Sequence, residues 1–126
     1  MTFHEKAPSP SLDGEIVTKA VLRAADYLGV KGEKLAKVLG LSTTTVSRMR
    51  AGNYVLQRGE KPFELAVLFV RLFRSLDAII GGDEAVARAW LRNENTMLDG
   101  VPLENIQTVS GLVDAISYLD ARRALV

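Results

Sequence analysis

The position that most constrains this chain is Gly40, which separates two short segments whose apolar residues recur at helical spacing. Residues 32–39 form the first segment and residues 43–50 the second, and each is about two turns of helix long. Glycine tolerates the positive φ that a sharp turn between two helices requires, and Ser42 stands where a hydroxyl can cap the second helix. This order predicts a helix-turn-helix over residues 31–52, with its turn at Gly40.

Such a unit needs small and apolar side chains where its two helices cross, and the sequence supplies them. Ala36 is small enough for the crossing point, and Leu41 can plug the turn. Val46 and Met49 are three residues apart, so both point inward from the second helix. The side chains that then face outward are hydroxyls and guanidiniums: Thr43, Thr44, Ser47, Arg48 and Arg50.

An outward face of this composition suits a helix that lies in the major groove of DNA. Arginine pairs with guanine there, and short hydroxyls reach bases or phosphates. The helix N-terminus at Ser42 can meet a phosphate, and Lys34 and Lys37 on the first helix are expected to face the DNA backbone. The alternative is a helical hairpin within an all-α protein whose polar residues are simply solvated. We favour DNA binding and expect residues 43–50 to read the DNA.

The distribution of charge is compatible with a DNA partner. Residues 1–62 hold ten basic and six acidic residues, whereas residues 63–126 hold six basic and nine acidic ones. All six lysines lie in the first part. A basic lobe beside an acidic one fits a chain with two partners, the basic lobe facing phosphates. Taken alone, the asymmetry fits a chance clustering of solvated charges equally well.

The composition argues against an enzyme. The 126 residues include no cysteine and one histidine, His4, so thiol chemistry and disulfides are excluded and a histidine-based metal site lacks members. The pair Gly81-Gly82 breaks a helix and does not open a glycine-rich phosphate loop. We therefore expect a binding protein without metal or cofactor.

The sequence also argues against a membrane partner. No run of 18 or more apolar residues lacks charges, and residues 1–11 do not have the basic-then-apolar order of a signal peptide. We therefore expect a cytoplasmic protein that does not enter a membrane.

The other segments read as helices, and no segment shows the alternation of a strand, so the sequence predicts an all-α fold. A helix opening at Asp13 or Gly14 is expected to place these side chains on one apolar face: Ile16, Val17, Ala20, Val21, Ala24 and Leu28. Later helices are expected over residues 62–80, from the cap Asp83 to about Arg92, over residues 102–106, and from the cap Ser110 to about Ala124.

These elements predict a flexible tail over residues 1–12, a DNA-binding domain over residues 13–61 and a helical domain over residues 62–126. Residues 65–70 are apolar all round, so this part of the helix over residues 62–80 must be buried on more than one side. A core helix or an oligomer interface satisfies that demand, and we expect a homodimer.

The second half carries a spaced set of residues that resembles a known family. The set comprises Gly82-Asp83, Ala89-Trp90-Leu91, Asn95, Leu98-Asp99-Gly100, Pro102-Leu103 and Gly111. In this order and spacing it resembles the toxin-binding domain of the Xre/MbcA/ParS-type antitoxins. With the helix-turn-helix ahead of it, the resemblance covers about residues 15–124.

The resemblance implies a partner and a mechanism that composition and spacing do not supply. Such antitoxins are paired with RES-domain toxins, which degrade NAD or transfer its ADP-ribose. The antitoxin binds the toxin, blocks its NAD pocket in part with its C-terminal end, and the complex represses its own operon. The resemblance therefore implies an antitoxin of a type II toxin–antitoxin system. The alternative is a stand-alone helix-turn-helix regulator whose C-terminal half only dimerises.

The C-terminal residues allow two interpretations. Arg122 and Arg123 favour a helix C-terminus, where a cation meets the helix dipole. Under the resemblance, they enter an anion-binding NAD pocket together with Leu125 and Val126, where the pyrophosphate would stand. Both interpretations stay open at this point. Trp90, the single tryptophan, is expected to lie in the core.

Overall fold

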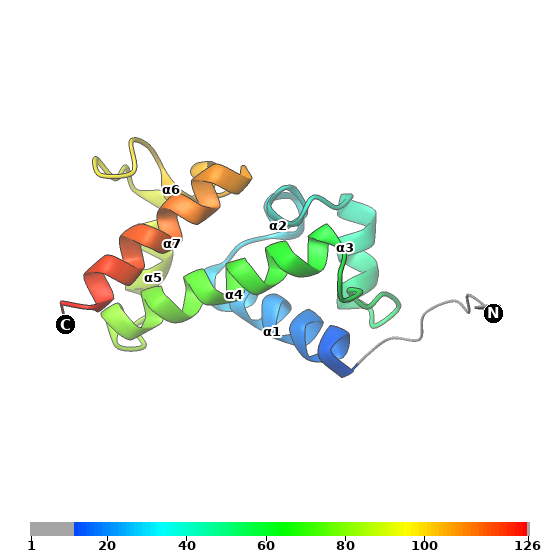
Figure 1. The fold of residues 1–126 in the computed structure, drawn as a ribbon. Coiled ribbons are helices and arrows are strands. Elements are labelled where there is room, and N and C mark those ends of the chain that lie inside the picture. The colour runs from blue at the N-terminus through cyan, green and yellow to red at the C-terminus, as the bar shows by residue number, and fades with distance from the viewer. Residues whose placement is uncertain (1–11, 126) are drawn as a thin grey trace, which may run out of the picture.

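A computed structural model describes residues 12–125, and this part of the chain folds into helices without a strand, as Figure 1 shows. In chain order the helices are α1 (Leu12–Leu28), α2 (Gly32–Leu39), α3 (Thr43–Arg50), α4 (Lys61–Ile80), α5 (Glu84–Arg92), α6 (Pro102–Asn105) and α7 (Val109–Arg123). The all-α prediction is confirmed. Of the expected tail, residues 1–11 lie outside the described residues, and Leu12 already begins α1.

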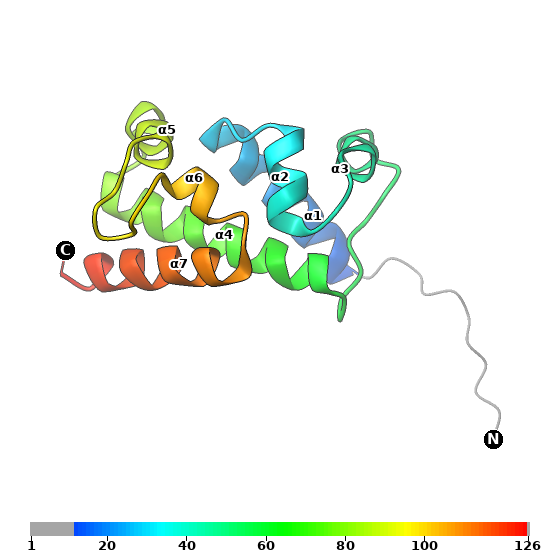
Figure 2. The same cartoon turned by 90° about the horizontal axis from the view of Figure 1, so that it is seen from above.

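The long helix α4 is the centre of the molecule. It packs against both α1 and α7. Figure 2 shows α7 running beside α4, with α2 and α5 on the side of α4 that faces away from α7. Phe69 and Leu72 have no exposed surface, so α4 contributes the middle of one continuous core. This confirms that residues 65–70 are buried on more than one side, although Val67 keeps 42% of its surface exposed.

The helix-turn-helix has the predicted bounds and the predicted turn. Gly40 ends α2 with a φ of 70°, in the left-handed region that glycine adopts without strain. Ser42 caps α3, because its hydroxyl accepts a hydrogen bond of 3.1 Å from the backbone N–H of Thr45. Local chemistry therefore decides where these two helices end and begin.

Two sequence predictions about helices are wrong. The last helix is capped by Thr108, whose hydroxyl accepts a hydrogen bond from the N–H of Gly111, and Ser110 already lies inside the helix. The earlier start lets Gly111 pass so close to Asn105 that a Cβ on it would lie 1.8 Å from the Asn105 carbonyl oxygen. In α1, the inward face includes Gly14 and Thr18, whereas Ile16 is 55% exposed. The periodicity placed Ile16 on the buried face because hydrophobicity alone does not show which side of α1 meets α4.

Two arginines of α5 join the two halves of the chain. Arg92 donates hydrogen bonds to the carbonyl oxygens of Leu28 and Gly29, at 3.0 and 2.7 Å. Arg88 donates to those of Asp26 and Tyr27, both at 2.9 Å. These carbonyls are at the C-terminal end of α1, where backbone acceptors lack partners within the helix. The second half of the chain thus caps the first helix of the first half.

Candidate functional sites

The outward face of α3 is positioned by two side chains that lock the helix to the core. Val46 and Met49 are 1% and 3% exposed, and they fix the rotation of α3 about its axis. The opposite face, formed by Thr43, Thr44 and Ser47, is exposed and near the capped N-terminus of the helix. Thr43 and Thr44 lie in the first turn, where backbone N–H groups have no partner within the helix, and Ser47 lies one turn later on the same face, an arrangement suited to an anion or to base edges.

Arg48 lies at the edge of this face and is held in place by the loop that follows α3. Its guanidinium lies 5.6 Å from the ring centroid of Tyr54 and donates to the carbonyl oxygen of Asn53 at 3.4 Å. Sequence reasoning missed both contacts, since residues 53–61 carry no periodic pattern. Stacking on an aromatic ring leaves the edge of a guanidinium available to a further acceptor.

Two residues predicted to contact DNA have acidic partners within the chain. Arg50 forms an ion pair of 2.7 Å with Asp26 of α1, and Lys34 forms one of 2.8 Å with Glu104 of α6. The hydrogen bond from Lys34 is the main reason why the pKa of Glu104 lies below its ordinary value. Lys37 is exposed, and the described residues give it no ion pair. Of the two predicted lysines, Lys34 is therefore the one held in a close ion pair.

The C-terminal end of α7 carries the residues predicted to bind the toxin, and its two arginines contact different side chains. Arg122 lies 5.8 Å from the ring centroid of Tyr118, which in turn stacks on Trp90 of α5 at 6.4 Å. Arg123 instead approaches Ser75 of α4, with 3.4 Å between its Nη1 and the serine Oγ. Trp90 is half-buried against the core, as expected.

The other two residues predicted to bind the toxin, Leu125 and Val126, come after the end of α7. Leu125 is 84% exposed, and Val126 lies outside the described residues. The end of α7 therefore presents an exposed cation and an exposed apolar side chain next to each other.

A third polar group lies between α4 and α7, and the sequence did not single it out. Asp120 accepts hydrogen bonds from Ser75 at 2.8 Å and from Arg71 at 2.6 Å. The hydrogen bond from Ser75, helped by Arg71, holds the pKa of this carboxyl below its ordinary value. The carboxylate is therefore a fixed negative charge that orients one arginine.

Over residues 12–125, no cluster of three potential metal ligands occurs, and no helix has the length and hydropathy needed to cross a bilayer.

Comparison with protein families identifies both halves. A family model of the antitoxin Xre-like helix-turn-helix domain matches residues 14–71, and one of the antitoxin Xre/MbcA/ParS C-terminal toxin-binding domain matches residues 75–124. The chain belongs to the Xre/MbcA/ParS antitoxins. Comparison with curated proteins gave no match. The toxin-binding match favours the antitoxin over the stand-alone regulator.

The two domains of the antitoxin share α4. The DNA-binding match ends and the toxin-binding match begins within this helix, whereas the sequence placed the domain boundary between residues 61 and 62, which stays a prediction. The shared helix and the arginine contacts to α1 connect the DNA-binding and toxin-binding halves of the antitoxin directly.

Proposed function

We propose that this antitoxin represses its own operon by placing α3 in the major groove of operator DNA. The observation that carries this proposal is the exposed face formed by Thr43, Thr44 and Ser47, with Arg48 at its edge. Hydroxyls at a helix N-terminus bind phosphates and base edges, and a free guanidinium edge suits guanine. Lys37 contributes a phosphate contact from α2, with Lys34 and Arg50 available only if their ion pairs open.

The test compares Arg48→Ala with Arg50→Ala, two changes in the same helix that remove the same charge. Affinity for the DNA upstream of the antitoxin's own gene is measured by fluorescence anisotropy over a range of salt concentrations. We expect the Arg48 variant to lose roughly tenfold or more in affinity, because a bidentate arginine–guanine pair contributes about 1–3 kcal/mol of discrimination. The Arg50 variant should lose less. Unchanged affinity and salt dependence for the Arg48 variant would contradict the assignment of α3.

The toxin partner that we propose is a RES-domain protein whose NAD pocket is blocked by the end of α7. Support comes from the match to the toxin-binding family and from the exposed side chains at the end of α7, which are Arg122, Arg123 and Leu125. Val126 follows them in the sequence. Guanidiniums donate paired hydrogen bonds to carboxylates and other oxygen acceptors, so the two arginines can anchor the end of α7 on the toxin while its bulk keeps NAD out of the pocket. The antitoxin acts in the cytoplasm, as a binding protein and not as an enzyme.

Removal of residues 122–126 tests this second proposal. NAD consumption by the toxin is measured with the full chain and with the truncated chain at equal concentrations. The truncated chain should bind the toxin more weakly and leave it active. Its DNA binding and thermal unfolding provide the control, since neither depends on the pocket. Full inhibition by the truncated chain would show that the C-terminal end is not the plug.

The toxin–antitoxin assignment also has a genetic test. It requires a neighbouring, co-transcribed gene whose expression without the antitoxin arrests growth. The two products should co-purify. A gene without such a neighbour would favour the stand-alone regulator.

The antitoxin is further proposed to act as a homodimer. A twofold axis lets two copies of α3 meet operator half-sites about 34 Å apart. Helix α4 is the element predicted to associate, and its exposed Val67 is compatible with that role.

A further inference from the structure

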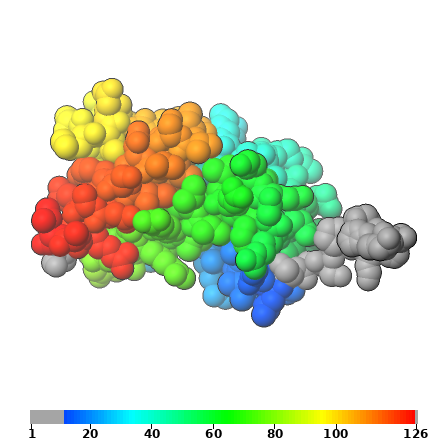
Figure 3. Space-filling model, viewed as in Figure 1, coloured from blue at the N-terminus to red at the C-terminus, as the bar shows by residue number. Residues whose placement is uncertain are grey.

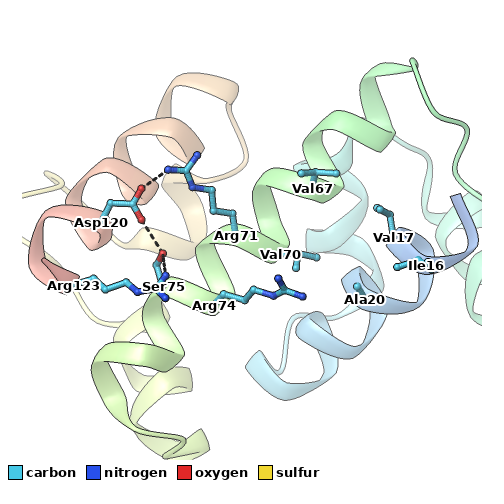
Figure 4. A pocket seen from close by; sticks show the side chains of 10 residues that line it. All are labelled: Ile16, Val17, Ala20, Val67, Val70, Arg71, Arg74, Ser75, Asp120 and Arg123. Carbon is cyan, nitrogen blue, oxygen red and sulfur yellow. Dashed lines mark hydrogen bonds and ion pairs between the residues drawn. The ribbon is translucent and has the colours of Figure 1, made fainter. Parts of the chain in front are cut away.

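A groove of about 400 Å³ lies on the face where α1, α4 and α7 meet, shown from close by in Figure 4. Its apolar half is formed by Ile16, Val17, Ala20, Val67 and Val70. The other half is charged: Arg71 and Arg123 lie beside the carboxylate of Asp120, and Arg74 extends toward the apolar half.

The groove exposes apolar surface that the fold leaves uncovered. Ile16 and Val67 are 55% and 42% exposed, and Leu12, one turn before Ile16 in α1, is 71% exposed. The lining carries more positive than negative charge, because it includes three arginines and one aspartate. An occupant must therefore offer apolar side chains and a carboxylate next to them.

The exposed side of α4 itself offers apolar side chains with a carboxylate next to them. Glu64, Val67, Arg71 and Arg74 are all exposed and recur at spacings of three and four residues, so they form one stripe along the helix. The stripe is acidic at Glu64, apolar in the middle and basic toward the end of α4, and Lys61 in the first turn pairs with Glu64 at 3.8 Å. Glu15, on the exposed side of α1 near Ile16, adds a second carboxylate at the acidic end.

Such an order is complementary to itself when two copies of α4 pack antiparallel. If the twofold axis passes near Leu68, Glu64 lies about 6 Å to one side of it, and Arg71 and Arg74 lie about 5 and 9 Å to the other. Each glutamate then falls between two arginines of the second copy, while Val67 meets Val67. A contact in which one patch meets itself is the geometry of a closed twofold dimer.

We propose that this groove is the homodimer interface of the antitoxin, with α4 of one copy antiparallel to α4 of the other. The proposal rests on the dimer of the proposed function and assigns it a face and a register. Figure 3 shows this face, with α4 between α1 and α7. The alternative occupant is the toxin. A toxin segment that satisfies the arginines would leave Glu64 with Lys61 of its own helix as its one cation, at 3.8 Å, whereas a second copy also brings arginines to Glu64.

The first experiment compares Val67→Asp with Val113→Asp in the full chain. Val113 is the matched control, because it is 44% exposed and lies on the toxin-binding domain away from the groove lining. Sedimentation velocity over a concentration series gives the dimer dissociation constant. We expect it to rise by roughly a hundredfold or more for the Val67 variant, since the two new carboxylates face each other, and to stay unchanged for the control.

Charge reversal tests the register and remains informative if the Val67 variant does not fold. Glu64→Arg and Arg74→Glu should each weaken the dimer, because like charges then face each other across the axis. The double variant should restore the dimer in part, because the charges at positions 64 and 74 are exchanged while Arg71 is unchanged. Failure of the double variant to restore a dimer weakened by both single changes would overturn the antiparallel register.

The outcomes of these experiments distinguish the existence of a homodimer from the assignment of its interface to this groove. A wild-type chain that stays monomeric at all concentrations would overturn both. A wild-type dimer that survives Val67→Asp would overturn only the face assigned here. If Val67→Asp leaves the dimer intact and abolishes binding of the toxin, the groove belongs to the toxin and the proposal is wrong.

Discussion

The guanidinium of Arg92 in α5 donates a hydrogen bond of 2.7 Å to the carbonyl oxygen of Gly29, the residue that follows α1. Together with Arg88, it satisfies the carbonyl groups at the end of α1 and places positive charge at the negative end of the helix dipole. The toxin-binding domain therefore completes the first helix of the DNA-binding domain.

Replacement of Arg92 by alanine should lower the stability of the whole chain. Three hydrogen bonds from a charged donor are lost, two of them to the carbonyl groups of Leu28 and Gly29 and one to that of Arg88, so we expect a loss of about 1–3 kcal/mol. Urea unfolding followed by Trp90 fluorescence measures it. Arg23→Ala is the control, since Arg23 is exposed on α1 and lines only a shallow surface depression. Equal stability of the two variants would contradict the capping role.

Gly111→Ala should destabilise the chain by at least about 2 kcal/mol. The added Cβ would lie 1.8 Å from the carbonyl oxygen of Asn105, so the backbone of one of the two segments would have to move. Gly32→Ala is the matched control within a helix, with the nearest atom, in Val46, at 3.9 Å. The control should be neutral or stabilising by up to about 1 kcal/mol. Thermal unfolding of both variants compares them, and a Gly111 variant as stable as the control would mean that the close approach to Asn105 does not exist.

Lys34 and Lys37 should differ in their contribution to DNA binding. The sequence expects both at the phosphate backbone, but Lys34 is paired with Glu104 and Lys37 has no ion pair among the described residues. Lys37→Ala should reduce the slope of log affinity against log salt by about 0.9, the value for one phosphate contact. Lys34→Ala should change it less. A larger loss for Lys34 would show that its ion pair opens on DNA.

The parts of the fold that follow from local chemistry were predictable from the sequence. Gly40 has the positive φ that its place between two apolar segments demanded, and Ser42 and Asp83 cap the helices that follow them. The outward side of α3 was predictable as well, because Val46 and Met49 must both face the core and this fixes the rotation of α3 about its axis. These features depend on neighbours within four or five residues.

The features that were not predicted depend on residues far apart in the chain. Arg88 and Arg92 appear in the sequence as ordinary exposed cations of an amphipathic helix, and their acceptors lie more than 60 residues earlier. The partner of Lys34 lies 70 residues later. Thr108 and Ser110 are equally good caps by composition, and packing of Gly111 on Asn105 selects the first. Tertiary packing therefore decides which charges remain for DNA and toxin.

Stability at acidic pH should depend on Asp120. Its folded-state pKa is lowered by Ser75 and Arg71, so the carboxylate stabilises the fold at pH values above the ordinary aspartate pKa. That contribution is lost as the pH falls below about 4 and the group becomes protonated. Asp120→Asn should therefore lower the melting temperature at pH 7 and have little effect near pH 3. A variant whose deficit is equal at both pH values would show that the lost interaction is not one of charge.

Arg122 and Arg123 should contribute unequally to inhibition of the toxin. Arg123 approaches Ser75 at the edge of the groove between α4 and α7, whereas Arg122 is supported by the ring of Tyr118, itself stacked on Trp90. A cation held on an aromatic ring reaches an acceptor on the toxin with less loss of side-chain freedom. Arg122→Ala should therefore weaken inhibition of the toxin's NAD consumption by roughly tenfold, as expected for the loss of one charge-assisted contact of about 1.4 kcal/mol. Arg123→Ala should weaken inhibition less. Tyr118→Phe keeps the ring and loses only the long hydrogen bond of 3.4 Å from Arg122 to the hydroxyl, so it should retain most of the inhibition, whereas Tyr118→Ala should approach the Arg122 variant. Equal inhibition by the two arginine variants would mean that the aromatic support has no part in presenting the charge to the toxin.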